Sequence, residues 1–492
     1  MKLTIENKTT FLNDYYFQTL CLLYFPGEKF REDDPGENAA SFLLERRDSG
    51  FYCKTVLKAG ERTAEGSFFT EGYVPKVTFS ESDFAAMALG KAYLNAASKL
   101  FGFALPWGYL LGLRPVKRAK YYLDRGYSEQ IVEDLFVYDY GVSVQKARLA
   151  VETAALENKM LVDTRPNDCG LYLSIPFCPT KCDYCSFISC ATPKLLGLIP
   201  SYLERLKRDL VETCRVIRET GMRLTAVYVG GGTPSILDPE QLKDLLSCLN
   251  SCLPKEHIRE FSFEAGRPDT ITEEKLQILK SFEIDRISIN PQTTNDEVLK
   301  RIGRKHSVKQ FFEIAKLAKT IGFSVLNADL IAGLPGDTED SFRKSLSDVM
   351  ELGFDNITVH TLSVKKSAVL RFSEDGVYDP AGVLARKCVE YAWETLRSGG
   401  WMPYYLYRQK NIVGNAENVG YAKPGTENLY NVLMMEEYST VFSCGAGAIT
   451  KLVNGTRDQI CRLANQKYPY EYLDTDLGIR EPEIKEFFSQ YS

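Results

Sequence analysis

Short apolar runs alternate with longer amphipathic stretches through the middle of the chain, from about residue 165 onward. These runs predict six strands, at residues 171–175, 225–229, 260–264, 286–290, 325–331 and 356–362. Between them, apolar residues recur at helical spacing, which predicts helices at 199–219, 239–253, 272–282, 308–322 and 338–353. Strands and helices in this order are typical of parallel strands joined by right-handed crossovers. The pattern therefore predicts an α/β fold, a partial (β/α)6 barrel.

The sequence on either side of this core lacks the regular alternation of strand and helix patterns. Residues 1–165 have a β-containing start followed by helical patterns at 81–100, 128–137 and 144–158, which predict a separate N-terminal α+β domain. No motif indicates what this domain does. Residues 166–375 form the barrel core, and residues 376–492 are expected to form a smaller C-terminal domain that caps the substrate site. A chain of 492 residues is long enough for two or three domains.

Composition narrows the class of protein. The chain is 44% hydrophobic and 25% charged, as in soluble globular proteins, and its formal net charge of -5 gives no basic footprint for nucleic acid. No apolar run approaches the ~20 residues of a membrane span, and the first residues lack the apolar core of a secretory signal. Thirteen cysteines in a chain of this length indicate a reducing compartment rather than a disulfide scaffold. We therefore expect a cytoplasmic protein that binds neither nucleic acid nor membrane.

The most informative residues are three cysteines directly after the first predicted barrel strand. Cys178, Cys182 and Cys185 have the spacing C-x3-C-x2-C. Three thiolates on one loop can each bind one iron of a [4Fe–4S] cluster, whereas structural zinc usually takes four protein ligands. The alternative is that they are ordinary buried thiols. That reading suits Cys248 and Cys252 better, since they lie one turn apart among apolar residues of a predicted helix.

Further polar and glycine residues follow the ends of other predicted strands. The segment 230–234, Gly-Gly-Gly-Thr-Pro, lets backbone approach a ligand closely, although such turns are common in α/β proteins. Glu264, Gln292 and Asp329 also lie at or near the C-terminal ends of predicted strands. The carboxyl ends of strands form the working edge of such barrels, so these residues are candidate ligand contacts. The alternative for each carboxylate is a solvated side chain.

The cysteine segment resembles the radical S-adenosylmethionine (SAM) signature. The whole set of motifs resembles the oxygen-independent coproporphyrinogen III oxidase family, and within it the HemZ-type coproporphyrinogen dehydrogenases. The resemblance covers residues 165–365, with fainter similarity to about 455, and rests on the following residues: Tyr172, 175–178, 230–234, 263–265, 287–292, 302–306 and 329–336.

This resemblance implies a set of cofactor contacts. Cys178, Cys182 and Cys185 would bind three irons, and SAM would chelate the fourth. The implied SAM contacts are Gly231, Gly232, Thr233, Glu264, Gln292, Arg304 and Asp329. Three further residues would pack around the cluster and adenine: Tyr172, Tyr184 and Ile331.

The resemblance also implies an activity and partners. The expected enzyme is an oxidoreductase of haem (porphyrin) biosynthesis that converts coproporphyrinogen III to protoporphyrinogen IX by oxidative decarboxylation. It would act as a monomer with an electron donor such as flavodoxin or ferredoxin. A substrate with four carboxylates calls for cationic anchors, and the candidates are Arg267, Lys365, Lys366 and Arg408. The alternatives are a haem- or tetrapyrrole-binding trafficking protein on the same fold, and a radical SAM enzyme with another substrate.

The chain departs from the family pattern at two places. Ser186 and Phe187 stand where bacterial oxidases often have glycine and a further cysteine, which leaves the role of Cys190 open. Residues 430–435, Tyr-Asn-Val-Leu-Met-Met, stand where the related haem chaperones resemble one another in a His-Asn-x-x-Tyr-Trp motif. The histidine proposed to bind haem is therefore missing, which favours the enzyme over the carrier.

Overall fold

The computed structural model describes all residues except 32–33, 113, 186–188, 364–381, 410–411 and 491–492. The chain divides into two compact units. The N-terminal unit comprises Met1–Ala155 and Leu406–Glu417, and the barrel unit comprises Leu156–Tyr405 and Asn418–Ser492. The three domains expected at 1–165, 166–375 and 376–492 stay a prediction.

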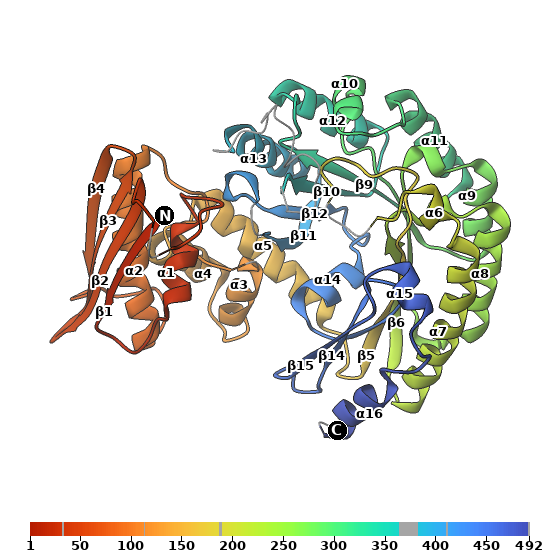
Figure 1. Ribbon diagram of the computed structural model, residues 1–492, viewed down its shortest axis with the longest axis horizontal. Helices are drawn as coiled ribbons and strands as arrows, with labels where there is room; N and C mark the ends of the chain where they lie inside the picture. Colours follow the sequence, from red (N-terminus) through yellow and green to blue (C-terminus); the bar gives the residue numbers. More distant parts are fainter. Residues whose placement is uncertain (32–33, 113, 186–188, 364–381, 410–411, 491–492) are drawn as a thin grey trace. The chain divides into compact units, whose positions relative to one another are not determined.

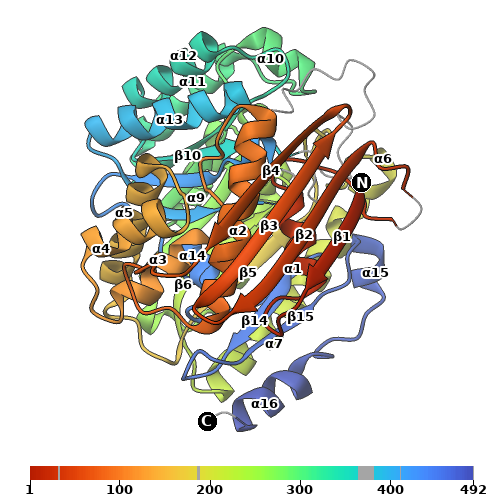
Figure 2. The ribbon, with the colours of Figure 1, turned by 90° about the vertical axis from the view of Figure 1, so that its left-hand side faces the viewer.

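The N-terminal unit is built on a four-stranded sheet that is seen face-on in Figure 2. β1 (Lys2–Asn7) pairs parallel with β2 (Asn38–Arg47), while β3 (Gly50–Ala59) and β4 (Arg62–Phe69) complete an antiparallel meander. Side chains of β3 alternate between buried and half-buried, because only one face of the sheet meets the helices. The helices are α1 (Asp14–Cys21), α2 (Glu81–Phe101), α3 (Pro115–Leu123), α4 (Glu129–Asp134) and α5 (Val144–Leu161). The helix expected at 128–137 changes to a π-helical turn over Leu135–Asp139.

A late segment of the chain completes this unit. Glu417 is 1% exposed, and its carboxylate accepts hydrogen bonds from Lys146 Nζ at 2.6 Å and from Trp107 Nε1 at 2.8 Å. Both partners are buried as well. Loss of Glu417 alone would leave the Lys146 ammonium buried without a counter-charge, which is strongly destabilising.

The barrel unit confirms the predicted core. Its six parallel strands stand in sequence order in the sheet: β5 (Asp168–Ile175), β6 (Arg223–Gly231), β7 (Glu260–Gly266), β8 (Arg286–Ile289), β9 (Val325–Ala332) and β10 (Asn356–Thr361). Helices line the outside of these strands in Figure 1. They are α6 (Pro193–Leu196), α7 (Ile199–Glu219), α8 (Pro239–Cys252), α9 (Glu273–Ser281), α10 (Asp296–Arg301), α11 (Val308–Ile321) and α12 (Glu339–Glu351). The predicted α/β class and partial barrel are therefore correct.

The C-terminal part of the chain extends this sheet at both edges. β13 (Thr440–Cys444) pairs parallel with β5, and β14 (Ile449–Val453) and β15 (Ile460–Ala464) follow it antiparallel. At the other edge, β12 (Asn418–Ala422) pairs antiparallel with β10, and β11 (Met402–Tyr407) lies beyond it. The remaining helices are α13 (Val383–Ser398), α14 (Leu429–Glu436), α15 (Pro469–Leu473) and α16 (Glu481–Gln490). The barrel sheet thus contains eleven strands.

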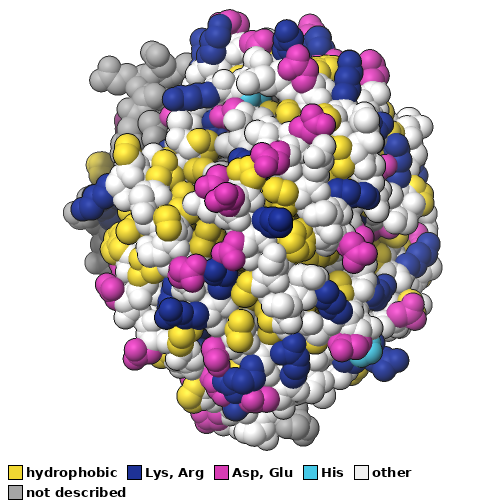
Figure 3. Space-filling model, turned by 90° about the vertical axis from the view of Figure 1, so that its right-hand side faces the viewer, with side chains coloured by type: hydrophobic (Ala, Val, Ile, Leu, Met, Phe, Trp, Pro, Cys, Tyr) yellow, Lys and Arg dark blue, Asp and Glu magenta, His cyan; other side chains and the backbone are white. Residues whose placement is uncertain are grey.

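The outer face of the barrel unit carries both signs of charge. In Figure 3, lysine and arginine side chains are interspersed with aspartate and glutamate, and none of these groups forms a large one-signed field on the face shown. In the part of the chain that the structure describes, no helix has the length and apolar character needed to cross a bilayer.

Candidate functional site

The cysteine loop is held by its own backbone. The peptide N–H of Cys178 donates to the carbonyl of Cys190 at 3.1 Å, and the N–H of Cys190 donates to the carbonyl of Pro176 at 2.8 Å. The N–H of Cys185 closes a turn onto the carbonyl of Cys182 at 3.0 Å. Cys190 therefore supports the loop through its main chain, which the sequence could not indicate. Residues 186–188, including Ser186 and Phe187, lie outside the described residues.

The three thiols lie in a buried and partly positive environment. Cys178 and Cys182 are buried, and Cys185 is half-buried. The Thr233 hydroxyl lies 3.4 Å from Cys178 Sγ, and the Arg267 guanidinium lies 3.8 Å from Cys182 Sγ. Burial raises the pKa of Cys178 to about 12, while the Thr233 hydroxyl and Arg267 oppose that shift. A hydroxyl and a guanidinium favour thiolates, the form in which cysteine binds iron.

The three thiols lie on one loop, with the spacing that a cluster bound by three cysteines requires. Among the described residues, no three His, Cys, Asp or Glu side chains converge closely enough to bind one metal ion. In a [4Fe–4S] cube each thiolate binds its own iron, so the thiols need not converge on one point. Cys182 and Cys185 contribute to the raised pKa of Cys178, as expected for neighbouring thiols. The loop therefore fits a cubane cluster with three protein ligands.

The glycines at the end of β6 bring the turn that follows against the cysteine loop. Gly231 has φ 124°, and a Cβ there would lie 2.7 Å from the carbonyl oxygen of Ile175. A Cβ on Gly232 would lie 2.8 Å from Cys178 Sγ and 2.7 Å from the Phe177 carbonyl oxygen. The N–H of Gly232 also donates to Ile175 at 2.8 Å. Only glycine permits this approach, and the turn and loop therefore form one edge of the candidate site.

Polar side chains line the barrel interior near the same edge. Glu264 lies in β7, directly after the residues that pair with β6. Burial together with the nearby Asp329 carboxylate raises the pKa of Glu264 to about 8. Asp329 Oδ1 accepts from Asn327 Nδ2 at 2.9 Å, and Asp329 Oδ2 lies 3.7 Å from His360 Nε2. Two neighbouring carboxyl groups with little solvent are typical of a site that recognises polar donors.

Gln292 occupies an unusual backbone position between these groups. Its φ is 67°, in the left-handed region that non-glycine residues rarely adopt, and it is 8% exposed. Its peptide N–H donates to Asp329 and its carbonyl accepts from Ile331, each at 2.9 Å. Among the described residues, Gln292 Oε1 has no hydrogen-bond partner. A strained, buried and unsatisfied amide is typical of a ligand site.

Arg304 is buried beside the cysteine loop. Its Nε and Nη2 donate to the Tyr184 hydroxyl at 3.2 and 2.9 Å, and its Nη1 donates to the Asn290 carbonyl at 3.4 Å. Arg304 is 9% exposed. A buried guanidinium whose partners are neutral is suited to bind a carboxylate. The predicted residues Arg304 and Tyr184 are therefore brought together.

Tyr172 lies in a stack of three tyrosines inside the barrel. Its ring centroid is 6.1 Å from those of Tyr228 and Tyr430, which are themselves 4.7 Å apart. Tyr172 and Tyr228 are register partners on β5 and β6, and Tyr430 comes from α14. Tyr228 is not among the site residues that the sequence predicts. Its signal is its place two residues before Gly230, on the same face of the strand.

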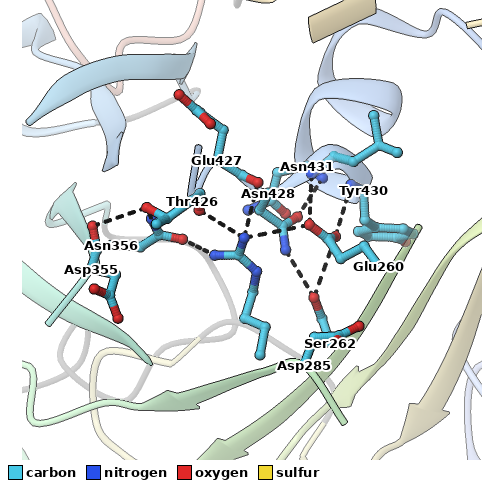
Figure 4. Close-up of polar contacts among 12 residues, drawn as sticks. Glu260, Ser262, Asp285, Asp355, Asn356, Thr426, Glu427, Asn428, Tyr430 and Asn431 are labelled. Atoms are coloured by element: carbon cyan, nitrogen blue, oxygen red, sulfur yellow. Dashed lines mark hydrogen bonds and ion pairs between the residues drawn. The ribbon is translucent and has the colours of Figure 1, made fainter. Parts of the chain in front are cut away.

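The floor of the barrel is a buried polar network, shown in Figure 4. Arg286, the first residue of β8, donates to the carbonyls of Thr426 and Glu427 at 2.7 and 2.9 Å and lies 3.5 Å from Glu260. Arg286 also donates to Asn356 Oδ1. Glu260 accepts from the peptide N–H groups of Leu429 and Tyr430 at 2.9 and 3.2 Å. The network thus fixes the start of α14 beneath the tyrosine stack.

The candidate substrate anchors are mostly engaged elsewhere. Arg267 pairs with Asp269 at 2.8 Å and donates to Thr180 Oγ1 at 2.7 Å. Arg408 belongs to the N-terminal unit, where it donates to the carbonyl of Leu110 at 3.0 Å. Lys365 and Lys366 lie outside the described residues. Of the four candidates, the two that the structure describes, Arg267 and Arg408, are therefore both engaged in contacts within the protein.

Glu264→Gln is expected to change how stability depends on pH. The folded carboxyl keeps its proton up to about pH 8, whereas the unfolded one loses it near 4.5, so wild-type stability falls as pH rises between these values. The amide does not titrate, so the stability of the variant should not fall in this way. The melting temperature of Glu264→Gln, relative to that of the wild type, should therefore rise as the pH increases toward 8. Glu274→Gln, at an exposed position on α9, is the control. Parallel pH profiles for wild type and Glu264→Gln would contradict the raised pKa.

Comparison with known proteins agrees with this geometry. The family described as the radical SAM superfamily matches residues 172–349, which contain the cysteine loop, the glycine turn and Glu264, Gln292 and Asp329. The oxygen-independent coproporphyrinogen-III oxidase-like protein HemZ of Bacillus subtilis (strain 168) is 34% identical over 476 residues, covering 95% of this chain and 93% of that protein. The similarity thus extends over both units.

Two further proteins are similar over less of the chain. The heme chaperone HemW of Bacillus subtilis (strain 168) is 31% identical over 328 residues, covering 64% of this chain and 80% of that protein. The solved structure of coproporphyrinogen III oxidase (HemN) from Escherichia coli, a radical SAM enzyme, aligns with a TM-score of 0.52 and 24% identity, over 67% of this chain and 72% of that one. This last likeness shows a common fold.

Sequence, fold and site now agree on the family. The superfamily uses a [4Fe–4S] cluster and SAM as cofactors, and the loop of three thiols fits such a cluster. The chain belongs to the radical SAM superfamily, among the oxygen-independent coproporphyrinogen-III oxidase-like proteins of the HemZ type.

Proposed function

We propose that the protein decarboxylates propionate side chains of coproporphyrinogen III oxidatively, without oxygen, to form protoporphyrinogen IX. The similarity to the HemZ protein over 95% of the chain supports this proposal. In the proposed reaction, the bound cluster and SAM would supply the chemistry that removes a hydrogen atom from the propionate β-carbon. Loss of CO2 and of one electron to an acceptor then leaves a vinyl group, and an external donor such as flavodoxin or ferredoxin supplies the reducing electron.

The chain's own residues would bind and orient the cofactors. Cys178, Cys182 and Cys185 would hold the cluster, with Thr233 close to the first of these thiols at 3.4 Å. Arg304 would pair with the carboxylate of SAM, because its described partners are the neutral Tyr184 hydroxyl and the Asn290 carbonyl.

The remaining proposed contacts are polar groups of the barrel interior. Gln292 Oε1, which lacks a partner among the described residues, would accept a hydrogen bond from the ligand. A protonated Glu264 can donate a hydrogen bond, and its pKa of about 8 keeps it protonated at neutral pH. Gly231 and Gly232 would present backbone, Asp329 would accept from the ligand, and Ile331 and Tyr172 would supply apolar contact.

Tyr430 is the observation that favours the enzyme over a haem carrier. It stands where the haem chaperones resemble one another in a histidine motif, and its ring is 5% exposed in the tyrosine stack. Burial raises the pKa of Tyr430 well above its ordinary value, so the phenol stays protonated. A neutral imidazole binds iron readily, whereas a phenol must first ionise. The described site therefore supplies no iron ligand at this position.

A haem- or tetrapyrrole-trafficking protein is the second candidate, because the heme chaperone HemW is 31% identical over 64% of the chain. A radical SAM enzyme with another substrate is the third, since the fold and cofactor site do not fix the substrate.

Product analysis separates these candidates. Anaerobic protein with a reconstituted cluster is incubated with coproporphyrinogen III, SAM and a reductant, and tetrapyrroles, CO2 and methionine are measured. We expect vinyl products and CO2, with only weak, non-stoichiometric haem binding in a parallel titration. Tight uptake of one haem per chain without vinyl product would replace the enzyme by the carrier. SAM cleavage that does not respond to coproporphyrinogen III would favour another substrate.

A further inference from the structure

Two cysteines outside the candidate site lie in direct contact. Cys214 is in α7 and Cys252 is the last residue of α8, and their sulfurs are 3.6 Å apart. They are separated by 38 positions along the chain, so the contact joins two neighbouring helices of the outer layer (Figure 1). Cys214 is 0% exposed and Cys252 is 8% exposed. Both thiols are therefore buried, and Cys252 is the more exposed of the two.

The surroundings of the pair favour reaction at Cys252. The Arg218 guanidinium, one turn after Cys214 on α7, donates to the carbonyls of both cysteines. The thiol of Cys214 and the charge of Arg218 hold the pKa of Cys252 below its ordinary value, whereas the pKa of Cys214 is raised. A lowered pKa increases the thiolate fraction, which is the reactive form.

Two other cysteines lie near the pair, and Cys248 also interacts with Cys252. Cys444 Sγ contacts Thr213 Oγ1 at 3.2 Å, and Cys248 Sγ points to the Lys207 carbonyl at 3.9 Å. Cys248 lies one turn before Cys252 on α8 and is half-buried, which makes it a matched control.

We propose that Cys214 and Cys252 form a modification site, a dithiol that low-molecular-weight disulfides convert reversibly into a disulfide linking α7 to α8. The Cys252 thiolate attacks a disulfide RS–SR, forms a mixed disulfide and releases RS−, which takes up a proton. The Cys214 thiol then loses its proton and attacks Cys252 Sγ, which releases the second RSH. The protein loses two electrons and two protons, and RS–SR becomes two RSH. The sulfurs must approach from 3.6 Å to about 2.05 Å, which side-chain rotation and small helix shifts can supply.

Peptide mapping tests this proposal independently of the proposed function. The anaerobic holoprotein is treated with oxidised glutathione, free thiols are alkylated, and tryptic peptides are identified by mass spectrometry, while cluster absorbance is followed. We expect a disulfide between peptides 209–215 and 244–255, its loss on treatment with dithiothreitol, and unchanged cluster absorbance. Cys248→Ser should keep this linkage, and Cys252→Ser should abolish it.

Several outcomes would overturn the proposal. A linkage that persists in Cys252→Ser but disappears in Cys248→Ser would assign the reactive thiol to Cys248. Stable glutathionylation of Cys252 in the wild type, with Cys214 still alkylated, would show that the second step does not occur. Free thiols at both positions after prolonged treatment would show that the pair is inert. The wild-type map alone decides the last two cases, so they do not depend on the folding of any variant.

Discussion

Cys182→Ala is expected to remove the iron–sulfur absorbance of the anaerobically reconstituted protein and its SAM cleavage together. Three thiolates are proposed to hold the cluster, and loss of one leaves an iron without its protein ligand. The change also leaves the Arg267 guanidinium without the sulfur that lies 3.8 Å from it. Iron and sulfide content, the visible spectrum and methionine release measure the effect, which we expect to be near-complete loss.

Cys248→Ala is the control for this experiment. Cys248 is half-buried on α8 and points to a backbone carbonyl in the outer helix layer. Its replacement should leave iron content and SAM cleavage at the wild-type level. Full iron content in Cys182→Ala would refute the assignment of the cluster to the loop.

Glu260→Ala is expected to lower the free energy of unfolding by about 3–5 kcal/mol, the usual cost of breaking a buried ion pair on one side. The change leaves Arg286 with a buried charge and removes the acceptor of two peptide N–H groups at the start of α14 (Figure 4). Urea unfolding followed by circular dichroism measures the change.

Two comparisons make this prediction specific. Glu256→Ala, at an exposed position in the turn before β7, should alter stability by less than about 0.5 kcal/mol. In a double-mutant cycle, Glu260→Ala with Arg286→Met should cost less than the sum of the single changes, because the buried charge is removed as well. A loss below about 1 kcal/mol for Glu260→Ala, or strict additivity, would show that the network contributes little.

The barrel core could be predicted because its signals are local. Each of the six strands is a short apolar run, and the helices between them repeat apolar residues with a period that only a helix satisfies. The position of the cysteine loop at the end of β5 follows from the same reasoning. The main-chain hydrogen bonds between the loop and Cys190 could not be predicted in this way, because they depend on the path of the backbone after the third cysteine.

The C-terminal strands could not be predicted because their partners are distant in sequence. β13 pairs with β5 across roughly 270 residues, and nothing within Thr440–Cys444 specifies that neighbour. The left-handed conformation of Gln292 is equally hidden, since tertiary hydrogen bonds to Asp329 and Ile331 impose it. The same applies to Glu260, a charged residue at a strand start that a sequence pattern assigns to solvent.

The buried contacts of Glu417 bear on how the chain folds as it is made. Lys146 and Trp107 are synthesised 271 and 310 residues before Glu417, which lies in the segment that completes their unit. At the ~5–20 residues/s of synthesis, this delay is roughly 14–60 s. During that time the first 155 residues lack a buried partner of Lys146 and Trp107, so this unit completes its core only after most of the chain has been made.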